Sequence, residues 1–261
     1  MAHAFRASLA KETASYFDDM RVHFGSRLGT QSQLFRCGST QPPPAATLIQ
    51  PTTEVKVYSV DTLLCAGKMV QQGRNPLVLN FASEKKAGGG WFKGSLAQEE
   101  SLMYRTTYGL SLDPKYNPQA RRLYPIPADA CIYSPDVFVM RDTEYTLLEY
   151  EHCYPVSFVA AAAPRRPTLS VNGTLTQIDA TRTQLKMQLI FDVALLHGHD
   201  SLVLGAWGSG VFRCPPVDMA RLFQKTLRQP QYAHRFKKVA FAVLGPPNDP
   251  NVVAYRSVFG Q

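Results

Sequence analysis

Two adjacent carboxylic acids, Glu99 and Glu100, follow a run of three glycines in the stretch GGGWFKGSLAQEES, residues 88–101. Carboxyl groups can give and take protons as general acids and bases. Neighbouring residues on a helix point about 100° apart, so this pair cannot face one another across a bond as a retaining glycosidase requires. One carboxyl could reach a reacting bond while the other holds a ligand hydroxyl. The alternative is a solvated pair that the helix dipole favours.

Two glycine-rich segments follow predicted strands. The triplet Gly88, Gly89 and Gly90 comes after the strand at 76–83, and GAWGSGVF (205–212) comes after the strand that begins at residue 201. Ligands of open α/β sheets bind beyond the carboxyl ends of strands, and glycine lets backbone amides approach phosphate oxygens closely. Two such loops could hold the two phosphates of a diphosphate. Neither segment is a P-loop or a GxGxxG motif, and the alternative is a pair of tight turns.

Strands and helices alternate around these segments. Apolar runs and period-two patterns predict strands at 54–60, 76–83, 154–164, 201–205 and 236–245, with a loop and then a strand at 131–142, where Pro135 interrupts the pattern. Helical spacing, caps and prolines predict helices at 3–24, 61–73, 95–110, 176–200 and 215–229. Such alternation predicts a three-layer α/β/α domain with a largely parallel sheet. A Gly/Ser/Gln/Pro-rich stretch at 38–51 indicates a linker, so we expect an N-terminal helical arm and linker at 1–50 and the main domain at 51–261.

Composition narrows the class of protein. The 261 residues are 45% hydrophobic and carry a formal net charge of +8, which favours polyanionic or phosphate-bearing partners. The five cysteines include no CxxC pair, which indicates reduced thiols in an intracellular protein, cytoplasmic or nuclear. The sequence contains no apolar run long enough for a secretory signal or a membrane span, so we expect no membrane partner.

The stretch LNFASEKKAGGGWFKGSLAQEESL (79–102) resembles the signature of the poly(ADP-ribose) glycohydrolases, which is three glycines, a spacer of six to eight residues, and Gln-Glu-Glu. The spacer here has seven residues. The wider pattern, which continues in YSPDVFVMRD, LVLGAWGSGVFRCPP and VAFAVL, resembles the microbial-type branch of that family over about residues 55–245. The resemblance implies a macrodomain-like core with a mixed, largely parallel sheet.

The resemblance also implies an activity and roles for particular residues. It implies hydrolysis of the ribose–ribose O-glycosidic bonds of poly(ADP-ribose) from the polymer ends, without a metal or other cofactor. Glu100 would be the catalytic acid and then the base that activates water, while Glu99 would hold the hydroxyl of the ribose beside the scissile bond. The glycine triplet would cradle the diphosphate and the terminal ribose. Gln98 lies on the same turn and has a less defined, structural role.

Further residues complete the site that the resemblance implies. Gly208, Ser209, Gly210 and Val211 would offer backbone donors to the diphosphate, Phe212 would pack against the terminal ribose, and Asn80 would bond that ribose. Asp61 follows a strand, as does the macrodomain aspartate that reads the adenine amino group. A plain helix N-cap explains Asp61 equally well.

Two other functions stay open at this point. One is hydrolysis of mono-ADP-ribose from a protein side chain or a nucleic-acid base; the other is a macrodomain reader that binds ADP-ribose without cleaving it. A reader needs the glycine loops but not Glu99 and Glu100, so the pair favours catalysis. The expected partners are therefore poly(ADP-ribose) or ADP-ribose, ADP-ribosylated proteins and, as a further polyanion, nucleic acid.

We expect a monomer. Trp91 and Trp207, each beside a glycine loop, are expected in the core.

Overall fold

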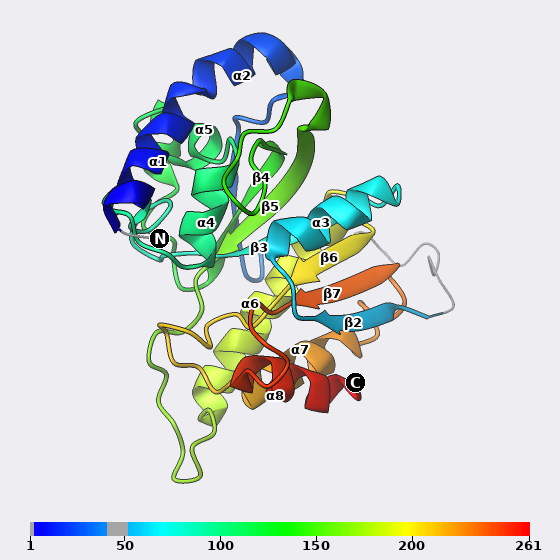
Figure 1. Ribbon diagram of the computed structural model, residues 1–261. Coiled ribbons are helices and arrows are strands. Elements are labelled where there is room, and N and C mark those ends of the chain that lie inside the picture. The colour runs from blue at the N-terminus through cyan, green and yellow to red at the C-terminus, as the bar shows by residue number, and fades with distance from the viewer. Residues whose placement is uncertain (1–2, 41–51) are drawn as a thin grey trace. The chain divides into compact units, whose positions relative to one another are not determined.

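The computed structural model describes residues 3–40 and 52–261 (Figure 1). The chain divides into two compact units. The first unit comprises Met1–Leu34, Asn80–Ala128 and Ile132–Ala161, and the second comprises Phe35–Leu79, Asp129–Cys131 and Ala162–Gln261. The linker predicted at 38–51 lies, from residue 41 on, outside the described residues.

The first unit contains the N-terminal helices, the glycine triplet and the glutamate pair. Its helices are α1 (His3–Ser15), α2 (Phe17–Phe24), α4 (Gln98–Arg105) and α5 (Gly109–Leu112), and its strands are β4 (Ala130–Val139) and β5 (Tyr154–Ala161). The two strands pair antiparallel. Helix α1 packs against α4 and against a short 3₁₀ helix, η2 (Trp91–Lys93), that follows the glycine triplet (Figure 1).

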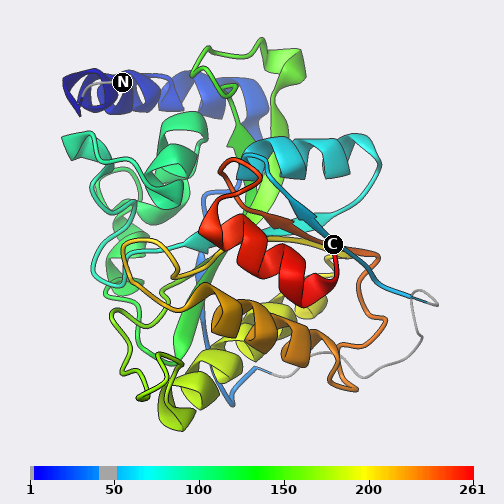
Figure 2. The same cartoon turned by 60° about the horizontal axis from the view of Figure 1, so that its bottom comes forward.

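The second unit has a parallel sheet at its centre. Its strands are β2 (Glu54–Tyr58), β3 (Pro76–Phe81), β6 (Ser201–Leu204) and β7 (Lys238–Ala242), and its helices are α3 (Thr62–Gln71), α6 (Gln177–Leu196), α7 (Pro216–Leu227) and α8 (Pro250–Phe259). Strand β3 pairs with β6, β6 with β7, and β7 with β2, all parallel. Helix α3 packs on β6 and β7, whereas α8 packs on β2 and on α7, which contacts α6. Figures 1 and 2 show α3 and the α6–α8 group on opposite faces of these strands.

All seven strands, including β1 (Gln33–Arg36), belong to one sheet in the order β1-β4-β5-β3-β6-β7-β2. The sheet is mixed because β4 and β5 run antiparallel, while the β3-β6-β7-β2 portion is parallel. The predicted α/β class with a mixed, largely parallel sheet is therefore confirmed. Leu77, Val78 and Leu79 of β3 are fully buried, which agrees with the continuous apolar run expected of a strand covered on both faces.

Several local predictions need correction. Residues 131–142 do not form a loop followed by a strand, because β4 continues through Pro135 by means of a bulge between Ser134 and Val137. A bulge adds an unpaired residue to a strand, and Asp136 takes it up with a φ of +48°. The helix predicted at 95–110 begins only at Gln98 and ends at Arg105.

The N-terminal helical segment is two helices, since the chain breaks at Tyr16 between α1 and α2. Helix α8 was missed altogether, although Asp249 caps it and Pro250 opens it. The expected burial of the tryptophans is confirmed, because Trp91 is 2% exposed and Trp207 is fully buried. All five cysteines are free thiols. No helix in the described part of the chain is long and apolar enough to cross a membrane.

Candidate active site

Glu100 joins the start of α4 to the glycine triplet. Ala97 is the N-cap of α4, and the Glu100 side chain turns back so that its Oε2 accepts the Ala97 amide at 3.0 Å. This is the return half of a capping box, which Ala97 cannot complete because it has no side-chain acceptor. Oε1 of Glu100 accepts the Gly90 amide at 2.9 Å. Each carboxyl oxygen thus keeps a lone pair for other chemistry.

Glu99 is more deeply buried and holds the other end of the loop. Its Oε2 accepts the Ser83 amide at 2.7 Å, and its Oε1 accepts the Gly88 amide at 3.1 Å. Burial raises the pKa of Glu99 from its ordinary 4.5 to about 8, and the nearby charge of Glu100 adds to the rise. Glu99 is therefore mostly protonated at pH 7. Because Glu99 is 3% and Glu100 8% exposed, the alternative of a solvated surface pair is excluded.

The three glycine amides are all engaged within the chain. Gly88 donates to Glu99 and Gly90 to Glu100, while the Gly89 amide donates to the Lys86 carbonyl at 3.2 Å. The expectation that these amides face a diphosphate finds no support in this hydrogen bonding. Their observed role is to wrap the loop around the two carboxyls.

Glycine is required at the centre of this loop. Gly89 has a φ of +54°, and a methyl group on it would lie 2.5 Å from Oε1 of Glu100 and 3.2 Å from Oε2 of Glu99. Both distances are shorter than ordinary van der Waals contact. The same small volume therefore brings the two carboxyls together, which their adjacent positions on a helix alone do not predict.

Asn80 and Gln98 connect the end of β3 to this pair. The Asn80 side chain is fully buried beside the Glu99 carboxyl, where it counters part of the rise in the pKa of Glu99. Apart from this interaction with the Glu99 carboxyl, neither polar atom of the Asn80 amide has a hydrogen-bond partner in the described part of the chain. Oε1 of Gln98 accepts the Phe81 amide at 2.9 Å, which supports the structural role expected of Gln98.

The N-terminal helix α1 supports the loop, a contribution that the sequence analysis missed. The buried Arg6 donates from Nε to the Gly94 carbonyl at 2.7 Å, and the hydroxyl of the buried Thr13 donates to the Tyr104 carbonyl at 2.8 Å. The Tyr104 hydroxyl lies 2.8 Å from both the Trp91 and the Ser95 carbonyls. Helical spacing at 3–24 indicated a helix, but nothing in it pointed to this neighbour.

The second glycine loop, Gly205–Phe212, lies in the second unit between β6 and α7. In the described part of the chain, no hydrogen bond occupies the backbone amides of Gly208, Gly210, Val211 and Phe212. The Ser209 hydroxyl is buried without a partner there, while Val211 is 73% exposed. The Ser209 amide, which was also expected to face the diphosphate, instead donates to the Ala206 carbonyl at 3.1 Å. Free backbone amides close together in a loop are the arrangement from which anion-binding nests are built.

Asp61 caps helix α3. Its Oδ1 accepts the amides of Leu63 at 2.9 Å and Leu64 at 3.1 Å. The N-cap alternative is therefore observed, and recognition of adenine by Asp61 stays a prediction.

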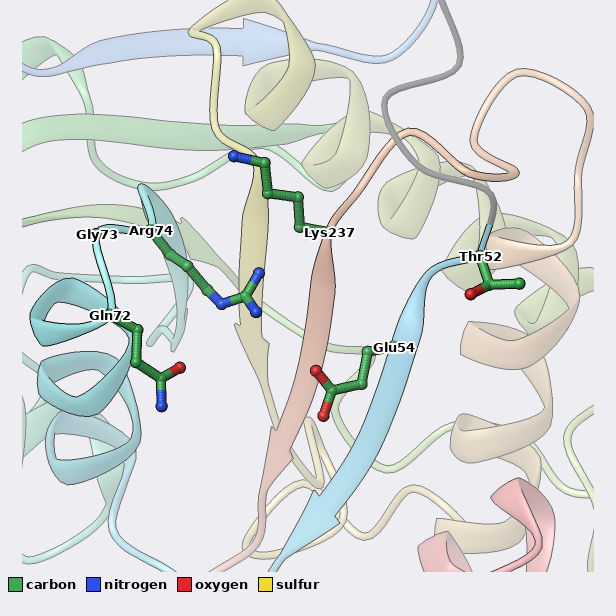
Figure 3. Close-up of a pocket in the computed structure, with 6 residues that line it drawn as sticks. All are labelled: Thr52, Glu54, Gln72, Gly73, Arg74 and Lys237. Carbon is green, nitrogen blue, oxygen red and sulfur yellow. The ribbon is translucent and has the colours of Figure 1, made fainter.

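A pocket of about 430 Å³ lies in the second unit (Figure 3). Thr52, Glu54, Gln72, Gly73, Arg74 and Lys237 line it. Lys237 is paired with Asp200 at 2.9 Å, and Glu54 with Lys238 at 3.1 Å. The pocket lies at the amino ends of β2 and β7, whereas ligands of parallel sheets bind at the carboxyl ends, so we assign it no role. Among the described residues, no cluster of three or more His, Cys, Asp or Glu side chains could hold a metal.

The family model "Microbial-type PARG, catalytic domain", where PARG is poly(ADP-ribose) glycohydrolase, matches residues 10–142. This match includes the glycine triplet, the glutamate pair and the C-terminal part of α1 from residue 10 on. The chain belongs to this family. A search of curated proteins gave no match.

Solved PARG structures resemble the chain over nearly its full length. The PARG of Thermomonospora curvata is 28% identical, with 98% of this chain and 100% of that chain covered and a TM-score of 0.80. The same protein bound to the inhibitor ADP-HPD is 30% identical over 97% of this chain and 99% of that chain, also at 0.80. The PARG of Deinococcus radiodurans in complex with ADP-ribose is 29% identical over 94% and 97%, at 0.69.

Proposed function

We propose that the protein is a poly(ADP-ribose) glycohydrolase that releases ADP-ribose from polymer ends. The observation that carries the proposal is the convergence of two buried carboxyls on Gly89, beside the fully buried amide of Asn80. Membership of the PARG family supports it, as does the presence of ADP-ribose in the Deinococcus radiodurans PARG. Buried polar groups are normally hydrogen-bonded, and the Asn80 amide has more donors and acceptors than its interaction with Glu99 uses, so a polar ligand would satisfy the rest.

Glu100 acts as the general acid and then as the base. It gives a proton to the ribose oxygen that leaves as the glycosidic bond breaks, and the anomeric carbon gains oxocarbenium character. Water then attacks that carbon and returns a proton to the Glu100 carboxylate, which restores the starting state. The amides of Gly90 and Ala97 each hold one carboxyl oxygen, so the acid is fixed in position before the substrate arrives.

Glu99 and Asn80 hold the substrate. A mostly neutral Glu99 bonds the hydroxyl of the ribose beside the scissile bond and places no negative charge next to Glu100. The Asn80 amide, which has both a donor and an acceptor to offer, bonds the terminal ribose.

The second glycine loop binds the diphosphate of an ADP-ribose unit. The free amides of Gly208, Gly210, Val211 and Phe212 supply donors, and the two glycines add no side chain in front of theirs. Backbone donors of this kind favour negatively charged oxygens. Phe212 packs against the terminal ribose.

A release assay tests the proposal. Purified protein is incubated with poly(ADP-ribose) without added metal, beside Glu100→Gln and the exposed control Glu144→Gln. We expect free ADP-ribose from the wild type and the control, and none from Glu100→Gln, which should still bind ADP-ribose. If the products are ADP-ribose oligomers instead of single ADP-ribose units, cleavage from the polymer ends is overturned.

No release by the wild type, together with ADP-ribose binding by all three proteins, would overturn polymer hydrolysis. Mono-ADP-ribosylated protein and nucleic acid would then be offered as substrates in the same assay. Hydrolysis of either mono-ADP-ribosylated substrate would establish a mono-ADP-ribosyl hydrolase. If neither is hydrolysed, the protein binds ADP-ribose without cleaving it, as a macrodomain reader does.

A further inference from the structure

Three arginines border the second glycine loop. Arg213 follows Phe212 directly in the chain, and the Arg166 amide donates to the Phe212 carbonyl at 2.7 Å. The guanidinium carbon of Arg165 lies 5.9 Å from the centre of the Phe212 ring, within range of a cation–π interaction. All three side chains are exposed. We call Arg165, Arg166 and Arg213 the arginine rim.

The rim has no countercharge within the described part of the chain. None of the three arginines forms an ion pair there. The acidic groups on the flanking segments are Asp179, whose Oδ2 accepts the Thr168 amide at 2.9 Å, and Asp218, whose Oδ2 accepts the Leu175 amide at 2.7 Å. In the described part of the chain neither carboxylate forms an ion pair with a rim arginine, so the three guanidinium groups can pair with an anion from outside.

Hydrogen bonds tie the rim to the loop. Besides the bond from Arg166 to Phe212, the Arg213 amide donates to the Gly210 carbonyl at 3.0 Å. Both Arg166 and Arg213 have a positive φ, of +51° and +60°. Arg213 is therefore held at the end of the loop that carries the free amides, and Arg166 lies on a segment hydrogen-bonded to that loop.

We propose that the arginine rim binds phosphates of the poly(ADP-ribose) chain beyond the ADP-ribose unit whose diphosphate the loop amides hold. This proposal rests on the proposed function. The four free amides of the loop suit one diphosphate, which leaves three full charges for further phosphates. Guanidinium groups bind phosphate oxygens through two parallel hydrogen bonds, and the repeat of the polymer supplies a diphosphate in every unit. The rim would thus make the protein prefer polymer to single ADP-ribose.

The experiment measures binding without cleavage, in the Glu100→Gln background. Arg165→Gln, Arg166→Gln and Arg213→Gln are combined, because glutamine keeps much of the side-chain stem. The matched control removes the same charge from exposed positions on α7 and its C-cap, as Arg221→Gln, Lys225→Gln and Arg228→Gln. Affinities for ADP-ribose, for polymer of defined length and for a single-stranded oligonucleotide are measured over a series of salt concentrations.

We expect the rim variant to lose at least tenfold in affinity for polymer, while its Kd for ADP-ribose stays within about twofold. Three phosphate contacts on a single strand contribute about −2 to the slope of log affinity against log salt, so the slope should become shallower by about 2. The control triple should lose far less. Equal losses in the two triples would overturn the proposal, since general charge would then explain the binding.

Two other results would also overturn it. An equal loss of ADP-ribose and polymer affinity would place the arginines on the diphosphate in the loop. A loss of nucleic-acid binding with polymer affinity unchanged would make the rim a nucleic-acid surface. Release of ADP-ribose by the wild type is measured separately, so a missing glycohydrolase activity overturns the proposed function, whereas polymer binding alone decides the role of the rim.

Discussion

Gly89→Ala tests whether the glycine at the centre of the loop is what brings the catalytic carboxyls together. Gly89 has a φ of +54°, and its new methyl carbon would lie 2.5 Å from Oε1 of Glu100. The oxygen must retreat by about 0.9 Å to reach an ordinary contact of 3.4 Å, and the 2.9 Å bond to the Gly90 amide must stretch or break. A displacement of about 1 Å can cost a factor of about 100 in rate, and a general acid contributes 10²- to 10⁴-fold, roughly. We therefore expect kcat for ADP-ribose release to fall about 100-fold.

Gly198→Ala is the matched control, because Gly198 has a φ of +71° and nothing within 4 Å of the added methyl group. Both variants should lose about 1–2 kcal/mol of stability from the left-handed backbone, which urea unfolding measures. Only Gly89→Ala should lose activity when both are assayed at 25 °C under conditions where circular dichroism shows them folded. If Gly89→Ala releases ADP-ribose as fast as Gly198→Ala, the placement of Glu100 against Gly89 is not needed for catalysis and the reasoning is wrong.

Three further predictions test the surroundings of the site. Tyr104→Phe removes the hydroxyl that bonds the Trp91 and Ser95 carbonyls. Urea unfolding should show a loss of about 1–3 kcal/mol in the free energy of unfolding, and the change in kcat should be larger than the change in KM. An unchanged kcat would contradict a role of Tyr104 in positioning the loop. Because the folded-state pKa of Glu99 is raised to about 8, its contribution to stability is complete below about pH 4.5 and is lost as pH rises through 8. The free energy of unfolding should therefore fall by a few kcal/mol across that window, and a Glu99→Gln protein with the same pH slope as the wild type would refute this. Asp61→Ser keeps an N-cap for α3, so the free energy of unfolding should change by less than about 0.5 kcal/mol. If Asp61 recognises adenine, the affinity for ADP-ribose should fall about tenfold. An unchanged affinity would mean that Asp61 serves only as the helix cap.

The sequence predicted those parts of the fold whose signals are local. The apolar run of β3 indicated burial on both faces, and Asp61 indicated the start of α3, because these signals come from the residues of the element itself. The start of α4 was placed three residues too early, since the cap there is made by the side chain of Glu100 rather than by Ser95. Pro135 was interpreted as a break, although a bulge accommodates it within β4.

The candidate site was predictable in its residues but not in its hydrogen bonding. The spacing between the glycines and the glutamates identified Glu99 and Glu100, yet it did not show that these carboxyls take up the amides of Gly88 and Gly90. The support from Arg6 was also missed. Both depend on contacts between segments distant in the chain, and residue spacing within one element carries no information about its tertiary neighbours.

The glycine triplet and the glutamate pair depend on each other. Burying two adjacent carboxyls costs free energy that only hydrogen bonds can offset, and four backbone amides provide them: those of Ser83 and Gly88 to Glu99, and of Gly90 and Ala97 to Glu100. Those amides reach the carboxyls because the loop has no side chain at Gly89. The loop in turn stays in place because the carboxyls occupy its donors. A change that removes either partner should therefore disturb both the fold of the loop and the acid that it positions, which is why adjacent glycines and adjacent glutamates occur together in this chain.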